Sequence, residues 1–102
     1  MTEETIQNIR LAIEKSASED AGVNCRAEHL ITVTVMEGWR DNIIWNAEVA
    51  TFLLKGHPIA KRAYGWQTGE GTDAKFTAVL EIPPVDSANT AVRVAIAAKA
   101  RR

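Results

Sequence analysis

Hydrophobic residues recur along this chain with two different spacings, and these spacings predict the order of its helices and strands. Residues 3–17 carry isoleucines at helical spacing, and Thr2 precedes them as a candidate N-cap. Residues 87–100 are rich in alanine and valine, and either Asp86 or Ser87 can cap a helix there. The pattern therefore predicts one helix near each end of the chain.

Between the two helices, apolar and polar residues alternate in a way that is typical of strands. The clearest stretch is residues 29–37, and similar stretches occupy residues 59–67 and 75–82. Residues 69–73 (GEGTD) form the strongest turn signal. Pro83-Pro84 ends the last strand, because proline cannot donate to a ladder.

Residues 43–54 (IIWNAEVATFLL) fit both periods, and the fold depends on them. As a helix they would end at Gly56 and Pro58, where helices usually stop. As a strand they use many β-formers, and residues 59–67 then follow as an antiparallel partner after a tight reversal. We favour the strand, and we expect so long a strand to bend at a bulge near Asn46-Ala47.

The predicted fold class is α+β: a helix, a four-stranded antiparallel sheet and a helix, with both helices on one face of the sheet. If residues 43–54 are helical instead, the fold becomes a variant of the ferredoxin-like arrangement. A chain of 102 residues fits a single domain, spanning residues 1–102.

A two-residue loop at Gly56-His57 would give the predicted hairpin two apolar faces, although a one-sided antiparallel sheet should alternate apolar with polar residues. One face pairs Val49 with Tyr64 and Thr51 with Arg62. We expect this face to meet a second copy of the chain, because Tyr, Trp and Arg are enriched at interface hot spots. The hypothesis is a non-enzymatic binding or adaptor domain that acts as a homodimer, with contact residues Val49, Thr51, Leu53, His57, Arg62, Tyr64 and Trp66.

A second hypothesis places a small molecule in a cleft instead, because aromatic side chains with a few polar groups make ligand sites. A small enzyme would use His57 and Tyr64 as acid and base groups. The sequence contains no nucleophile elbow and no glycine loop for phosphate, so we assign no catalytic residue. The residues expected to line such a cleft are Trp39, Trp45, Tyr64, Trp66 and His57.

Charge argues against nucleic acid as the partner, since the formal net charge is −1. Residues 62–66 (RAYGW) resemble the aromatic strand motif of RNA-recognition-motif domains. However, Ala63 replaces the motif's first glycine, and Gln67 and Gly69 occupy its valine and last aromatic positions. The motif is therefore degraded, and together with the near-zero net charge this predicts no specific nucleic-acid binding.

Cys25 is the only cysteine, which excludes an internal disulfide and suits a reducing compartment, so we expect a cytoplasmic protein. The N-terminal sequence is not typical of a signal peptide, and no apolar run approaches the ~20 residues of a membrane span. Cys25 and His29 are too few ligands for a tetrahedral metal site, so we expect no metal or cofactor. We expect a buried thiol and a surface histidine.

Overall fold

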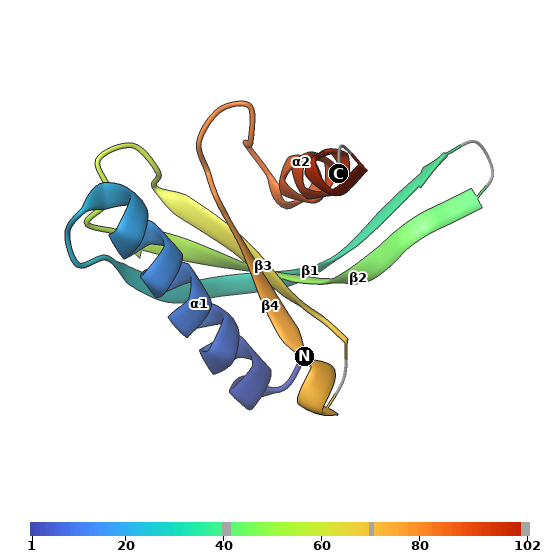
Figure 1. The fold of residues 1–102 in the computed structure, drawn as a ribbon, viewed down its shortest axis with the longest axis horizontal. Coiled ribbons are helices and arrows are strands. Elements are labelled where there is room, and N and C mark those ends of the chain that lie inside the picture. Colours follow the sequence, from blue (N-terminus) through green and yellow to red (C-terminus); the bar gives the residue numbers. More distant parts are fainter. Residues whose placement is uncertain (40–41, 70, 101–102) are drawn as a thin grey trace.

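The computed structural model describes residues 1–39, 42–69 and 71–100, and for residues 39, 42–45, 99 and 100 it describes the backbone alone. Two helices flank a four-stranded antiparallel sheet with strand order β1-β2-β3-β4 (Figure 1). The predicted class and element order are confirmed, and the helical alternative for residues 43–54 is wrong. The elements are α1 (Glu3–Ala21), β1 (Arg26–Trp39), β2 (Asn42–Lys55), β3 (Arg62–Thr68), a short 3-10 helix (Gly71–Asp73), β4 (Lys75–Leu80) and α2 (Ala88–Ala100).

Both ends of α1 are capped by local sequence. The Thr2 hydroxyl accepts a hydrogen bond from the Thr5 N–H at 3.2 Å, which satisfies a free donor of the first turn. At the other end Gly22 adopts the left-handed conformation, with φ of 73°, and donates its N–H to the Ser18 carbonyl. The helix therefore continues past residue 17, where the predicted helix ended, because Gly22 and not the polar residues before it terminates the helix.

The register of β2 and β3 differs from the predicted one by two residues. Thr51 lies opposite Tyr64 rather than Arg62, and Phe52 lies opposite Ala63. The cause is the connection between the strands, which uses all of residues 56–61 instead of a two-residue loop. A shift of two residues leaves each side chain on its predicted face, because the side-chain period of a strand is two.

The expected bulge at Asn46-Ala47 is also absent, since these residues continue the regular pairing opposite Met36 and Val35. The pairing between β1 and β2 is instead irregular at two other places. It shifts between His29 and Ile31 and again between Glu37 and Gly38. The first shift reverses which side of β1 faces each helix.

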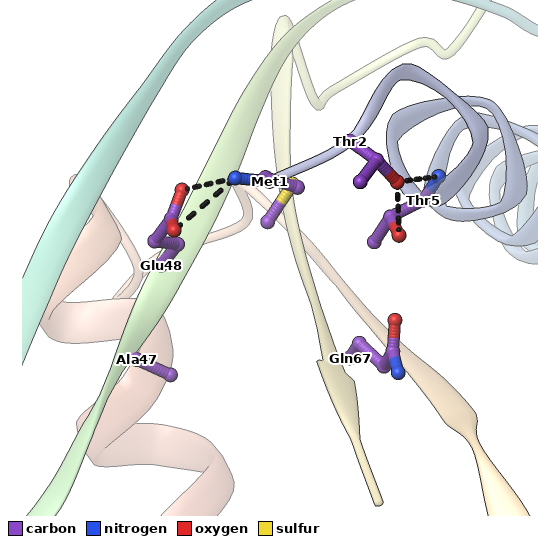
Figure 2. A pocket seen from close by; sticks show the side chains of 6 residues that line it. All are labelled: Met1, Thr2, Thr5, Ala47, Glu48 and Gln67. Atoms are coloured by element: carbon purple, nitrogen blue, oxygen red, sulfur yellow. Dashed lines mark hydrogen bonds and ion pairs between the residues drawn. The ribbon is translucent and has the colours of Figure 1, made fainter. Parts of the chain in front are cut away.

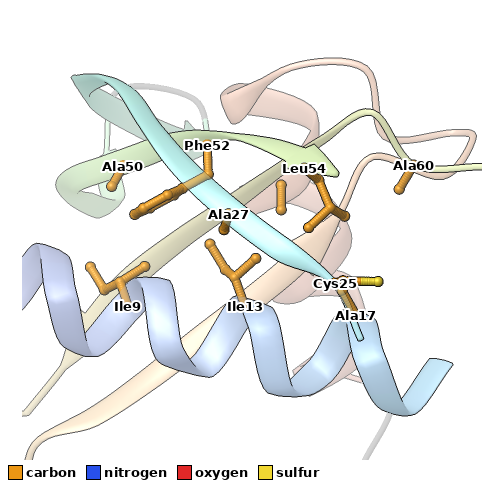
Figure 3. Close-up of a cluster of buried hydrophobic side chains, with 10 residues drawn as sticks. Ile9, Ile13, Ala17, Cys25, Ala27, Ala50, Phe52, Leu54 and Ala60 are labelled. Atoms are coloured by element: carbon orange, nitrogen blue, oxygen red, sulfur yellow. The ribbon is translucent and has the colours of Figure 1, made fainter. Parts of the chain in front are cut away.

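Buried side chains form two clusters on opposite faces of the sheet. Ile9 and Ile13 of α1 pack on one face, against a cluster that includes Phe52 and Ala63 (Figure 3). α2 packs on the other face, where its residues join a cluster that contains Tyr64. Ala63 and Tyr64 are successive residues of one strand, so their side chains point to opposite faces.

Each helix therefore covers a different face, and the prediction that both lie on one face is wrong. The physical reason lies in the sheet, because β2 and β3 carry apolar side chains on both faces. Each of these faces is stabilised by being covered, at about 25 cal/mol per Å² of apolar area removed from water. Within the described residues, no helix is long and apolar enough to cross a bilayer.

Candidate interaction surface

The predicted contact face is largely part of the core. Val49, Tyr64 and Trp66 are almost completely buried beneath α2, so they offer little surface to a partner. The Tyr64 hydroxyl donates a hydrogen bond to Glu81 Oε2 at 2.5 Å. Burial raises the pKa of Tyr64 well above its usual range, and the hydrogen bond to the Glu81 carboxylate raises it further. This tyrosine is held as a neutral donor inside the domain.

Three other predicted contact residues lie toward one end of the same face. Thr51 is buried, Leu53 is half-buried and Arg62 is exposed. Leu53 and Arg62 are opposite each other in the ladder, and Glu28 of β1 pairs with Leu53 on the other side. The part of the predicted face that a partner can reach is therefore a short row that is mainly polar and charged.

His57 was predicted as a contact residue, but it is buried and organises the connection between β2 and β3. Its Nδ1 accepts hydrogen bonds from the backbone N–H groups of Ile59 and Ala60 at 3.1 and 2.9 Å. Its Nε2 lies 2.6 Å from Asp20 Oδ2, at the end of α1. Because Nδ1 accepts two donors, the proton belongs on Nε2, which donates it to Asp20. The ring thus holds residues 56–61 against α1.

The residues of the alternative cleft are not brought together in the described part of the chain. His57 contacts Asp20 of α1, whereas Tyr64 and Trp66 belong to the cluster beneath α2. The side chains of Trp39 and Trp45 lie outside the described residues. His57 and Tyr64 each bind a different carboxylate, so they do not form an acid–base pair.

A pocket of about 280 Å³ lies elsewhere, between the start of α1 and the strands (Figure 2). It is open to solvent, and the Met1 ammonium binds Glu48 at its rim, with N–O distances of 2.9 and 3.2 Å. The remaining lining is Thr2, Thr5, Ala47 and Gln67. Among the described residues, no group of three or more His, Cys, Asp or Glu side chains is placed to hold a metal ion. Cys25 is the buried thiol that we expected.

The most unusual surface is the free side of β1, which lies at an edge of the sheet. Residues 30–36 (LITVTVM), which we call the edge segment, contain no charged residue and no proline. Leu30, Ile31 and Met36 are 49%, 56% and 58% exposed. Natural edge strands are usually blunted by charges, prolines or short length, and the edge segment has none of these protections.

Beyond the body of the domain, β1 and β2 continue as a two-stranded arm (Figure 1). β2 pairs with β3 only through Ala50–Leu53, so within the described residues its earlier part has β1 as its single partner. A two-stranded ribbon by itself is marginally stable in water. The arm and the edge segment together leave much of β1 without a neighbouring strand on its outer side.

The sequence did not indicate that the edge segment lies at an edge of the sheet. Residues 29–37 are the clearest strand of the chain, and an uncharged run of β-formers is typical of a strand with neighbours on both sides. The topology was needed to show that this strand lies at an edge. No family model matches the chain, and neither a curated protein nor a solved structure matches it.

Proposed function

We propose that this protein is a small non-enzymatic binding module that acts as a homodimer, and that the edge segment of β1 forms its contact. The observation that carries the proposal is the combination of a free strand edge with half-exposed Leu30, Ile31 and Met36. Such a segment combines strong β propensity, no charge and no proline, which makes it prone to pair with another strand. A stable subunit contact removes this hazard.

The buried residues support a binding role over catalysis. His57 and Tyr64 are the titratable groups that the sequence singled out, and both have structural hydrogen bonds. His57 shapes a loop, and Tyr64 joins β3 to Glu81, the residue that follows β4, so each has a role in the fold. A buried free thiol at Cys25 suits a reducing compartment, and we propose that the protein acts in the cytoplasm.

Light scattering at micromolar concentration tests the proposal. We expect the wild type to have twice the 11.2 kDa mass of one chain. Ile31→Lys places a charge on the free edge and is expected to give a monomer. Ile59→Lys is the matched control, because Ile59 is similarly exposed, at 60% against 56%, but lies outside the sheet.

Two results would contradict the proposal. One is a wild type that stays monomeric throughout the micromolar range. The other is a dimer that Ile31→Lys and Ile59→Lys affect equally, since the contact would then not depend on the edge segment.

A further inference from the structure

We infer that β1 of one copy pairs antiparallel with β1 of a second copy around Val33, so that two four-stranded sheets become one continuous sheet. The inference rests on the proposed homodimer and specifies its contact. The backbone on the outer side of β1 carries N–H and C=O groups that point away from β2. Only another extended strand can satisfy such a row of donors and acceptors without water.

Residues 31–37 are the regular part of β1, and the edge segment shares residues 31–36 with it, whereas Leu30 lies at the first irregularity. The pairing with β2 shifts between His29 and Ile31 at one end and between Glu37 and Gly38 at the other. Bulges of this kind bend a strand and interrupt its pairing. A partner strand therefore has a regular stretch of residues 31–36 available, and this stretch has no charges that would repel an identical copy.

Symmetry restricts how the segment can pair with itself. Along an antiparallel ladder, hydrogen-bonded pairs alternate with non-hydrogen-bonded pairs. A two-fold axis makes the pair i–j equivalent to the pair j–i, so these two pairs must be of the same kind. Because adjacent pairs are of different kinds, the axis cannot exchange two adjacent pairs. The axis must therefore pass through one residue that faces its own copy.

Val33 is the midpoint of the edge segment, and an axis there pairs the whole segment. Moving the axis to Thr32 would place Met36 opposite Glu28 and extend the ladder through the irregularity at His29. Moving it to Ile31 would place Met36 opposite Arg26, with the same defect. Moving it to Thr34 would place the charged Glu37 opposite Ile31. Val33 is thus the axis position that keeps the ladder within the uncharged edge segment.

The side chains match in this register. Leu30 meets Met36 of the second copy, Thr32 meets Thr34, and every such pair occurs twice. Cross-strand pairs of apolar or threonine residues each contribute about 0.2–1 kcal/mol. The axis is perpendicular to the sheet, so the two α2 helices lie on the same side of the joined sheet. The segment fits itself better than an arbitrary strand, which identifies a second copy as the partner.

A cysteine pair tests this register directly. Directly opposite residues have Cα atoms about 4.5–5.5 Å apart, within the range of roughly 4.4–6.8 Å that a disulfide spans. Thr32→Cys and Thr34→Cys chains should therefore cross-link when they are mixed and oxidised. Either variant alone should not, because the same residue in two copies is displaced diagonally by about 7–8 Å.

Two controls accompany the mixture. Wild-type protein should not cross-link, because Cys25 is buried. Thr32→Cys mixed with Thr68→Cys should not cross-link either, since Thr68 is exposed but lies at the end of β3. Hydrogen exchange of the unmodified protein supplies a measurement that needs no introduced cysteine. We expect amides of residues 30–36 to exchange more slowly as the protein concentration rises.

The outcomes separate this inference from the proposed function. Cross-linking confined to the mixture, with concentration-dependent protection of β1, supports the pairing around Val33. A dimer whose Thr32→Cys and Thr34→Cys chains do not cross-link when mixed overturns this pairing but leaves the proposed homodimer intact. The same holds for a dimer in which either variant alone cross-links as well as the mixture. A protein that is monomeric at every concentration tested, with no protection of β1, overturns both.

Discussion

Replacing Gly65 by alanine tests how closely α1 approaches the sheet. Gly65 lies in the middle of β3, and a Cβ atom there would overlap the Cγ2 atom of Ile9 and lie 3.1 Å from the Thr77 carbonyl oxygen. Ile9 is completely buried, so it has little room to move away. Gly65 has no positive φ that would strain an alanine, so the effect of the substitution comes from packing.

Two opposing terms set the expected magnitude. Overpacking a tight core costs typically about 1–3 kcal/mol. Alanine recovers about 0.5–1 kcal/mol, because glycine is unfavourable inside a strand. We therefore expect Gly65→Ala to lower the free energy of unfolding by about 1–2 kcal/mol.

The double variant with Ile9→Ala shows whether the overlap is the cause. Ile9→Ala alone should lower the free energy of unfolding by about 2–5 kcal/mol, because it leaves a cavity. In that background the new methyl group of Gly65→Ala enters the cavity, so the second substitution should be neutral or stabilising. The two changes should therefore couple favourably by about 1–3 kcal/mol. Val92→Ala is the control partner, since Val92 is equally buried but belongs to α2, which packs on the opposite face of the sheet, so additivity is expected.

The assay is urea unfolding followed by tryptophan fluorescence, at one fixed protein concentration because dimerisation adds to stability. The reasoning is refuted if Gly65→Ala leaves stability unchanged or raises it. It is refuted equally if Gly65→Ala costs the same in the Ile9→Ala background as in the wild type.

Two further predictions concern buried hydrogen bonds. Tyr64 is the only tyrosine, so ultraviolet absorbance should show its ionisation well above pH ~10 in the folded protein and near the usual value in denaturant. Because the folded-state pKa of Tyr64 is raised, its contribution to the stability of the fold is complete below pH ~10 and is lost as the pH rises above that value. The Tyr64→Phe variant should not show this loss of stability. His57→Ala leaves the N–H groups of Ile59 and Ala60 without an acceptor. It should therefore lower the free energy of unfolding, measured in urea, by about 1–3 kcal/mol. Asp20→Ala should lower it less, because the Asp20 side chain is 55% exposed. Equal losses for His57→Ala and Asp20→Ala would show that the contact with Asp20 matters more than the two backbone hydrogen bonds.

Local patterns in the sequence determined the elements of this fold. Helical spacing placed α1 and α2, and alternation placed the strands, because side-chain period and capping act over only a few residues. The choice of strand for residues 43–54 was correct because β-formers and a chain reversal pointed the same way. Apolar residues on both sides of β2 and β3 indicated that both faces are covered, but not by which part of the protein.

Tertiary structure decided the remaining features. The register of β2 and β3 depends on how residues 56–61 close the loop, and His57 closes it through a contact with Asp20 that is remote in the sequence. α2 covers Tyr64 and Trp66 because the chain after β4 carries it to the face opposite α1. Val49, Tyr64 and Trp66, three of the predicted contact residues, are consequently part of the core, and the free edge of the sheet lies at β1. Strand order is set by which pairs form over the whole chain, and no local pattern encodes it.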